Sequence, residues 1–178
     1  MAARKHDRVV QTGSQQRSGE HYERAVEMIH AGKLGEVHSI GAGFIRNAIP
    51  GFKLREITGA LPPTLDWNMW LGPAPNRPFD PFRCIYNFRW FWDYSGGQMT
   101  NWGAHHLDIA RWIVNEAGPT EVSGMGGRFM LADGGETPDV QNVLYRFRKS
   151  VITWTAREIS TGSPYSVMET WRKGTAAR

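Results

Sequence analysis

The chain has 178 residues, of which 40% are hydrophobic and 12% aromatic, enough apolar material for the core of one globular domain. A second full domain does not fit in this length. The single cysteine, Cys84, excludes an internal disulfide and a cysteine-based zinc site. No apolar run approaches the ~18 residues that suggest a membrane span, so we expect no membrane partner.

The net charge of +4 is carried by the two ends of the chain. Three basic residues lie among the first eight positions and three among the last eight, and the remainder is close to neutral. This distribution argues against a nucleic-acid partner. No apolar segment follows the basic residues at the start, so we expect no secretory signal there. The compartment stays open, with the cytoplasm favoured and the periplasm an alternative if an export signal lies upstream.

The first half of the chain predicts two strands and a helix. Residues 9–12 form a short β-branched run closed by Gly13, which favours a strand. A helix is expected between Ser18, as N-cap, and Gly32, because acidic residues occupy its first turn. Residues 37–45 are expected to form the second strand.

A long loop rich in proline and then in aromatic residues is expected in the middle of the chain. Residues 47–81 hold seven prolines, which limits regular structure to a short segment at 67–71. Residues 79–94 hold eight aromatic residues. Most of them are expected to form core beneath the loop, with a few free to stack on a ring-shaped substrate.

The second half predicts a helix at 99–115 and strands at 121–130, 140–147 and 151–158. The short connection at 148–150 is typical of a hairpin. Consecutive strands with short links indicate an antiparallel sheet. The expected fold is therefore α+β, an open and mostly antiparallel sheet with helices on one face.

The predicted helix at 99–115 carries Asn101, His105 and Asp108, whose spacing places them on one helical face. An imidazole, an amide and a carboxylate together suit acid–base chemistry. The alternative is that His105 and Asp108 only hydrogen-bond each other or a loop. His106 points about 100° away around the helix and is the weaker candidate.

Two other kinds of site are disfavoured. Adjacent histidines on a helix cannot both face one ion, so no metal site is expected from His105 and His106. Cys84 is expected to be a small packing residue rather than a nucleophile.

The run from Asp93 to Asp108 resembles the G-G-x-x-x-D-x-G-x-H-x-x-D segment of the glucose–fructose oxidoreductase, inositol dehydrogenase and rhizopine-catabolism (Gfo/Idh/MocA) oxidoreductases. The segments 65–75 and 11–17, together with the helix stop at 32–35, extend the resemblance. It covers roughly positions 3 to 158.

The resemblance implies a C-terminal domain from a two-domain design whose N-terminal Rossmann part binds NAD or NADP. Residues 1–17 would then be the end of the Rossmann domain, 18–170 the substrate and oligomerisation domain, and 171–178 a basic tail. No G-x-G-x-x-G segment follows a strand near the start, and no Glu-Lys-Pro occurs. We therefore expect the Rossmann part to be mostly missing and the chain alone to be inactive.

The resemblance also implies roles for individual residues. His105 would be the acid–base catalyst during hydride transfer between nicotinamide and a sugar or polyol. Asn101 stands where many members have aspartate, and an amide orients substrate without accepting a proton. Asp108 would orient His105 or bind substrate. The remaining residues implied are substrate contacts at Arg89, Trp90, Tyr94 and His106, and cofactor neighbours at Gln15 and Arg17.

Several alternatives stay open on the sequence. The chain could be a non-catalytic module that binds carbohydrate or dimerises through the open sheet, and the family also includes glycosidases that use NAD. Residues 168–175 resemble the family's G-T-K-G turn only in scrambled form. A truncated or frame-shifted reading frame would explain this. A sugar-like substrate and a homo-oligomer are the expected partners.

Overall fold

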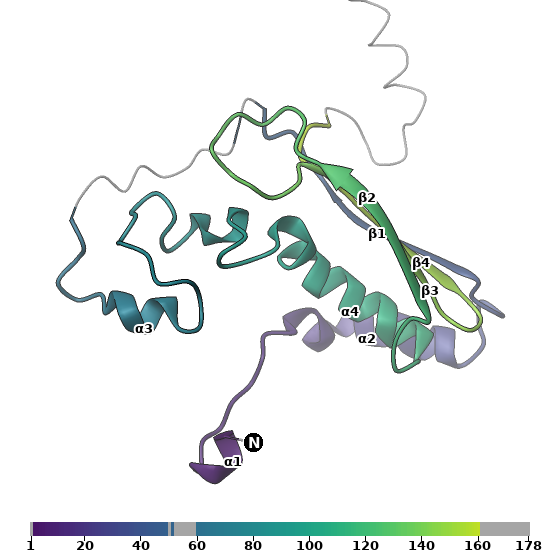
Figure 1. Ribbon diagram of the computed structural model, residues 1–178. Helices are drawn as coiled ribbons and strands as arrows, with labels where there is room; N and C mark the ends of the chain where they lie inside the picture. Colours follow the sequence, from purple (N-terminus) through teal and green to yellow (C-terminus); the bar gives the residue numbers. More distant parts are fainter. Residues whose placement is uncertain (1, 50, 52–59, 161–178) are drawn as a thin grey trace, which may run out of the picture.

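The computed structural model describes residues 2–49, 51 and 60–160. It contains a sheet with helices on one face, and a lobe of loops and short helices beyond one end of the sheet (Figure 1). The predicted basic tail at 171–178, the scrambled turn at 168–175 and the end of the predicted substrate domain lie outside the described residues.

The sheet has four strands, β1 (Ser39–Ile45), β2 (Glu121–Gly127), β3 (Val140–Arg146) and β4 (Val151–Arg157). Their order is β1-β4-β3-β2. The β2–β3 and β3–β4 pairs are antiparallel, whereas β1 and β4 run parallel. The predicted open, mostly antiparallel sheet in an α+β fold is therefore confirmed, as is the tight hairpin between β3 and β4.

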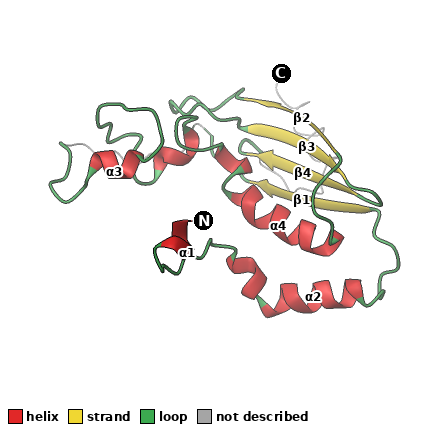
Figure 2. Ribbon diagram, turned by 60° about the horizontal axis from the view of Figure 1, so that its bottom comes forward, coloured by secondary structure: helices red, strands yellow, loops and turns green. Residues whose placement is uncertain are grey.

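The core lies between the sheet and helix α4 (Trp102–Val114). On β4 the side chains alternate, and Ile152, Trp154 and Ala156 are buried beneath the helix. Ala110 of α4 packs with Ile152 and Phe147. Helix α2 (Glu20–His30) lies beside α4, and the opposite face of the sheet carries no helix among the described residues (Figure 2). Each fully buried large side chain contributes about 1.5–3 kcal/mol.

The lobe has a small core of its own, built on the short helix α3 (Trp67–Leu71). Asp66 caps this helix, with its side chain accepting a hydrogen bond from the Met69 amide at 3.0 Å. Trp67 and Leu71 pack with Cys84, which is 1% exposed. The expectations of a short element at 67–71, an aromatic core under the loop and a packing role for Cys84 are confirmed.

The loop between β2 and β3 ties the lobe to the sheet. The Asp139 carboxylate accepts hydrogen bonds from three successive amides, those of residues 129–131. Burial opposes this charge, but the amides and the nearby Arg128 hold the pKa of Asp139 below its usual value. The Glu136 amide donates to the Trp90 carbonyl at 2.8 Å, which joins the loop to the 3₁₀ helix η2 (Asn87–Trp90).

Two sequence expectations about the start of the chain are wrong. Residues 9–12 are not a strand, because no described strand lies beside them to complete a ladder, and Val9 and Val10 are exposed. They follow a short helix, α1 (Ala2–Lys5). Gly19, not Ser18, is the N-cap of α2, because Ser18 ends the 3₁₀ helix η1 (Gln15–Ser18).

The predicted helix at 99–115 is divided in the structure. A 3₁₀ turn, η3 (Gly97–Met99), precedes α4, and Asn101 is the N-cap of α4 rather than a helical residue. Gly97 enters this turn with φ +63°, a conformation that favours glycine. A methyl group there would lie 2.6 Å from Thr137 Oγ1, in the loop between β2 and β3.

We predict that Gly97→Ala lowers the free energy of unfolding by about 2–4 kcal/mol, because the positive φ and the clash with Thr137 both act. Urea denaturation followed by circular dichroism measures the change. Gly32→Ala is the matched control, since Gly32 has φ +75° and open space around it. It should cost only about 1 kcal/mol. Equal losses in the two variants would contradict the close packing of Gly97 on Thr137.

Candidate functional site

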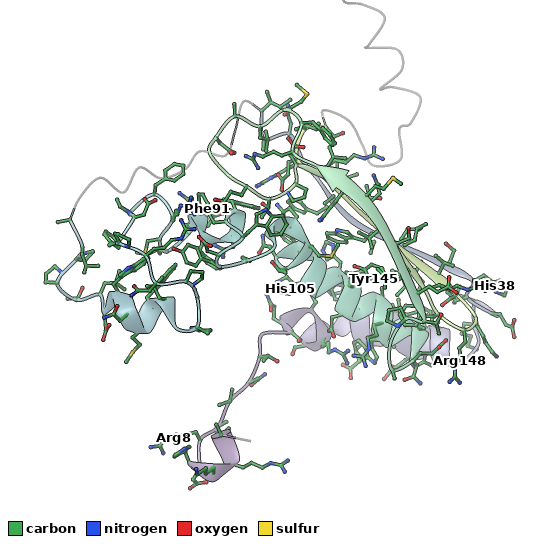
Figure 3. The ribbon with its side chains drawn as sticks, viewed as in Figure 1. Arg8, His38, Phe91, His105, Tyr145 and Arg148 are labelled. Carbon is green, nitrogen blue, oxygen red and sulfur yellow. The ribbon has the colours of Figure 1, made fainter. Side chains whose placement is uncertain are left out.

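His105 lies in the first turns of α4, on the side of the helix away from the strands (Figure 3). Its ring stands edge-on to that of Trp102, with 6.3 Å between centroids. The Nδ1 atom is buried and has no hydrogen-bond partner among the described residues. A buried N–H without an acceptor is costly, so the neutral ring carries its proton on Nε2. His105 is therefore set to donate a hydrogen bond from Nε2.

His106, the next residue, faces the sheet instead. Its Nδ1 lies 3.0 Å from the carbonyl oxygen of Gly43 on β1, and its ring stands edge-on to Trp154. Burial lowers the pKa of His106, which favours the neutral ring. The structure thus gives His106 a packing role and does not bring it beside His105 as a substrate contact.

Asp108 is held by Arg17 of η1. The two carboxylate oxygens accept hydrogen bonds from the Arg17 guanidinium at 2.6 and 2.9 Å. This bond raises the pKa of Arg17, and the guanidinium also lies 5.0 Å from the centre of the Trp112 ring. Asp108 therefore fixes η1 against α4, and no hydrogen bond joins Asp108 to His105 among the described residues.

Asn101 belongs to a line of polar side chains that we call the Asn101 network, composed of Arg46, Glu158, Gln98 and Asn101. The Asn101 Nδ2 donates to Gln98 Oε1 at 3.3 Å, and Gln98 Nε2 donates to Glu158 Oε1. The other Glu158 oxygen, Oε2, accepts from Arg46 Nε. Gln98 is 2% exposed and Glu158 1% exposed, so the middle of the network is buried.

Sequence reasoning missed Gln98 and Glu158, although one signal was present. Glu158 continues the buried alternation of Ile152, Trp154 and Ala156. A carboxylate at that phase of a strand must be paired, since an unpaired buried charge is strongly destabilising. An acidic residue in phase with the apolar positions of a strand therefore indicates a paired polar network at the end of that strand.

The other predicted site residues lie apart, three of them in the lobe and Gln15 in η1 beside α4. Trp90 is 3% exposed, which leaves little of its ring for a substrate, and Arg89 stacks over Tyr86. Tyr94 lines a cavity of about 460 Å³ beside α3, with Trp70 and Phe88. Gln15, in η1, is exposed.

A second cavity of about 370 Å³ adjoins the far end of the Asn101 network. Arg46, Tyr86 and Trp90 line it, together with residues 47–49 and 51. Glu158 and Gln98 therefore join this cavity to the start of α4, where His105 lies.

Neither a metal site nor a membrane-spanning helix occurs in the described part of the chain. No group of three His, Cys, Asp or Glu side chains is placed to hold an ion there. None of the helices described is long and apolar enough to cross a bilayer.

Comparison with known proteins gives a consistent family and fold. Residues 50–124 match the family model described as the oxidoreductase family, C-terminal alpha/beta domain. No curated protein matches the chain by sequence. Among solved structures, the fold is similar to GenD2 from gentamicin A biosynthesis in complex with NAD, with 18% identity and a TM-score of 0.59. That match covers 91% of this chain and 37% of GenD2.

Two further structures are similar at 16% identity. An inositol dehydrogenase homologue from Azotobacter vinelandii, complexed with NADH and myo-inositol, has a TM-score of 0.56 over 91% of this chain and 34% of its own. The WlbA dehydrogenase from Bordetella pertussis, in complex with NADH and UDP-GlcNAcA, has a TM-score of 0.51 over 84% and 36%. The chain thus spans about a third of the length of these structures.

We predict that neutral His105 is the Nε2–H tautomer, because its Nδ1 is buried without an acceptor. The ¹⁵N chemical shifts of the ring nitrogens, measured by NMR at a pH where the ring is neutral, distinguish the two tautomers. His105→Gln assigns the signals. A proton found on Nδ1 would contradict the burial of that atom without a partner.

Proposed function

We propose that this chain, which carries the C-terminal α/β domain of the Gfo/Idh/MocA oxidoreductases, is the substrate domain of an NAD(P)-dependent oxidoreductase acting on a sugar or polyol. The observation that carries the proposal is the placement of His105. Its Nε2 is set to donate to a substrate oxygen, while its neighbour Asn101 adds an amide at the same end of α4.

The chemistry assigned to His105 is hydrogen-bond donation to the reacting substrate oxygen. In both directions the neutral ring donates its Nε2–H to that oxygen and stabilises the negative charge that develops there while the hydride moves. Asn101 is neutral and cannot act as a base, so its part is to orient the substrate. Arg17 and Asp108 hold η1 against α4 and so fix the border of this region.

The described residues do not themselves form a dinucleotide site. They contain no βαβ unit with a glycine-rich turn, and Arg17, the basic residue expected beside the cofactor, is occupied by Asp108. The proposal therefore assigns the cofactor, NAD or NADP, to a Rossmann unit that these 178 residues do not supply. The nicotinamide would provide or accept the hydride.

A sugar-like substrate is supported by two of the similar structures. One is complexed with myo-inositol and another with UDP-GlcNAcA. Both compounds carry several hydroxyl groups, which the amide and imidazole groups at the start of α4 suit as hydrogen-bond partners.

The outer face of the sheet supports a second role, pairing with another copy of this chain. The register places Met125 and Leu144 on the face opposite Tyr145, which packs toward α4. Met125 is 83% exposed and Leu144 51%. Exposed apolar side chains on a sheet face without covering helices favour association of two sheets.

For the substrate site, we predict millimolar binding of myo-inositol, measured by calorimetry with and without NADH. His105→Ala should weaken it roughly fivefold to tenfold, the loss of one hydrogen bond. His38→Ala is the control, because His38 is exposed at the far end of the sheet (Figure 3). Binding that is absent, or weakened equally by both substitutions, would contradict the proposal. NADH oxidation by the chain alone would contradict its need for a Rossmann unit.

For the outer face, we predict a dimer that Met125→Lys with Leu144→Lys converts to a monomer, because two charges would then be buried between sheets. Analytical ultracentrifugation at micromolar concentration gives the mass. Met69→Lys is the matched control, since Met69 is 80% exposed on α3, away from the sheet. A monomeric wild-type chain would argue against pairing through this face.

A further inference from the structure

The Asn101 network has a direction imposed by its buried carboxylate. Ionised Glu158 can only accept hydrogen bonds, so Gln98 must turn its Nε2 toward Glu158 Oε1. The Gln98 Oε1 then points to Asn101, and only the Asn101 amide nitrogen can donate to it. The orientation of both amides therefore follows from donor and acceptor chemistry, starting from one charge.

Glu158 is well suited to set this direction. It is 1% exposed, and its other oxygen is bound by the Arg46 guanidinium, which offsets the cost of burying a negative charge. Gln98 is 2% exposed, so water does not compete for its amide. A flipped Gln98 would place two oxygens against each other in a buried position, which costs free energy.

The side-chain oxygen of Asn101, Oδ1, does not cap α4 and is available for a ligand. It is the N-cap residue of α4, where an asparagine oxygen ordinarily accepts a backbone amide, yet its side chain makes no capping bond. Among the described residues, no hydrogen bond engages Asn101 Oδ1. Its nitrogen is committed to Gln98, which leaves the oxygen for a ligand.

We propose that Gln98 and Glu158 are positioning residues that fix the Asn101 side chain so that Oδ1 accepts a hydrogen bond from a substrate hydroxyl beside His105. The ligand part of this inference rests on the proposed function. Asn101 then supplies the same kind of acceptor as the aspartate of the family pattern, without its charge.

The network also accounts for asparagine at this position. An aspartate at 101 could not donate to Gln98 Oε1, and Gln98 would lie between two carboxylates with a single amide nitrogen to offer. Asn101 and Glu158 are therefore coupled through Gln98. Exchanging the amide and the acid, to give Asn101→Asp with Glu158→Gln, reverses the two hydrogen bonds on either side of Gln98 and leaves each with a donor and an acceptor, whereas Arg46 then donates to a neutral amide oxygen.

A double-mutant cycle on the full chain tests this coupling by thermal unfolding at pH 7. Asn101→Asp should lower the melting temperature by roughly 5 °C, as expected for a partly buried acceptor without a donor. Glu158→Gln should also lower it, and the double variant should lose clearly less than the two single losses together. The matched controls are Asn76→Asp and Glu27→Gln, both at exposed positions. Additive losses would overturn the proposal.

A second route covers the case in which Glu158→Gln does not fold. In a Gln98→Leu background the link is gone, so Asn101→Asp should cause no further loss beyond that of Asn76→Asp in the same background. A persistent loss of several degrees there would also overturn the coupling.

Calorimetry with myo-inositol separates this inference from the proposed function. In Glu158→Gln alone, the hydrogen bonds of the Asn101 network can reverse, so that Asn101 presents its nitrogen to the ligand. Binding should then weaken roughly fivefold. In the double variant residue 101 presents an oxygen acceptor again, and binding should recover. Coupling in the thermal unfolding experiments without any binding of myo-inositol would contradict the ligand part of the inference and support the coupling within the network alone. Unchanged binding in Glu158→Gln would overturn the role of Asn101 Oδ1.

Discussion

The packing of α4 on the sheet determines what each residue of this helix can do. Gly103 and Ala110 are small and buried, and a side chain at Gly103 would lie 3.4 Å from the Trp154 ring. The helix therefore rests close to β4 with one orientation about its axis. Because adjacent helical residues point about 100° apart, this orientation turns His106 onto β1 and leaves His105 on the open side.

The sequence could predict the parts of the fold that depend on local patterns. Consecutive strands with short links, including the three-residue turn after β3, indicated the antiparallel core, and the proline-rich stretch indicated the loop around α3. The strand predicted at residues 9–12 is wrong because a strand needs a neighbouring strand, and no local sequence pattern shows whether one is present. The predicted boundary at Asn101 is wrong because a 3₁₀ turn precedes α4, and it begins at Gly97, which has a positive φ and packs against Thr137, far along the chain.

In the candidate site, too, the features that depend on nearby residues could be predicted, and those that depend on distant residues could not. His105 could be singled out from helical spacing and the family motif, because both act within a few residues. The partner of Asp108 could not, since Arg17 lies 91 residues away along the chain. A bidentate guanidinium satisfies both oxygens at once, which an imidazole cannot do. Spacing indicates which side chains can meet, and distant charges decide which of them do.

Stability and function meet at Glu158. A carboxylate this deeply buried is tolerated only while Arg46 offsets its lost hydration, so removing Arg46 leaves a costly buried charge on Glu158. The same charge orients Gln98 and, through it, Asn101. Arg46 also lines the cavity beside Trp90, so a ligand entering that cavity would meet the guanidinium on which this order depends. The interior ion pair thus links the cavity, the fold and the residue next to His105 through a single set of hydrogen bonds.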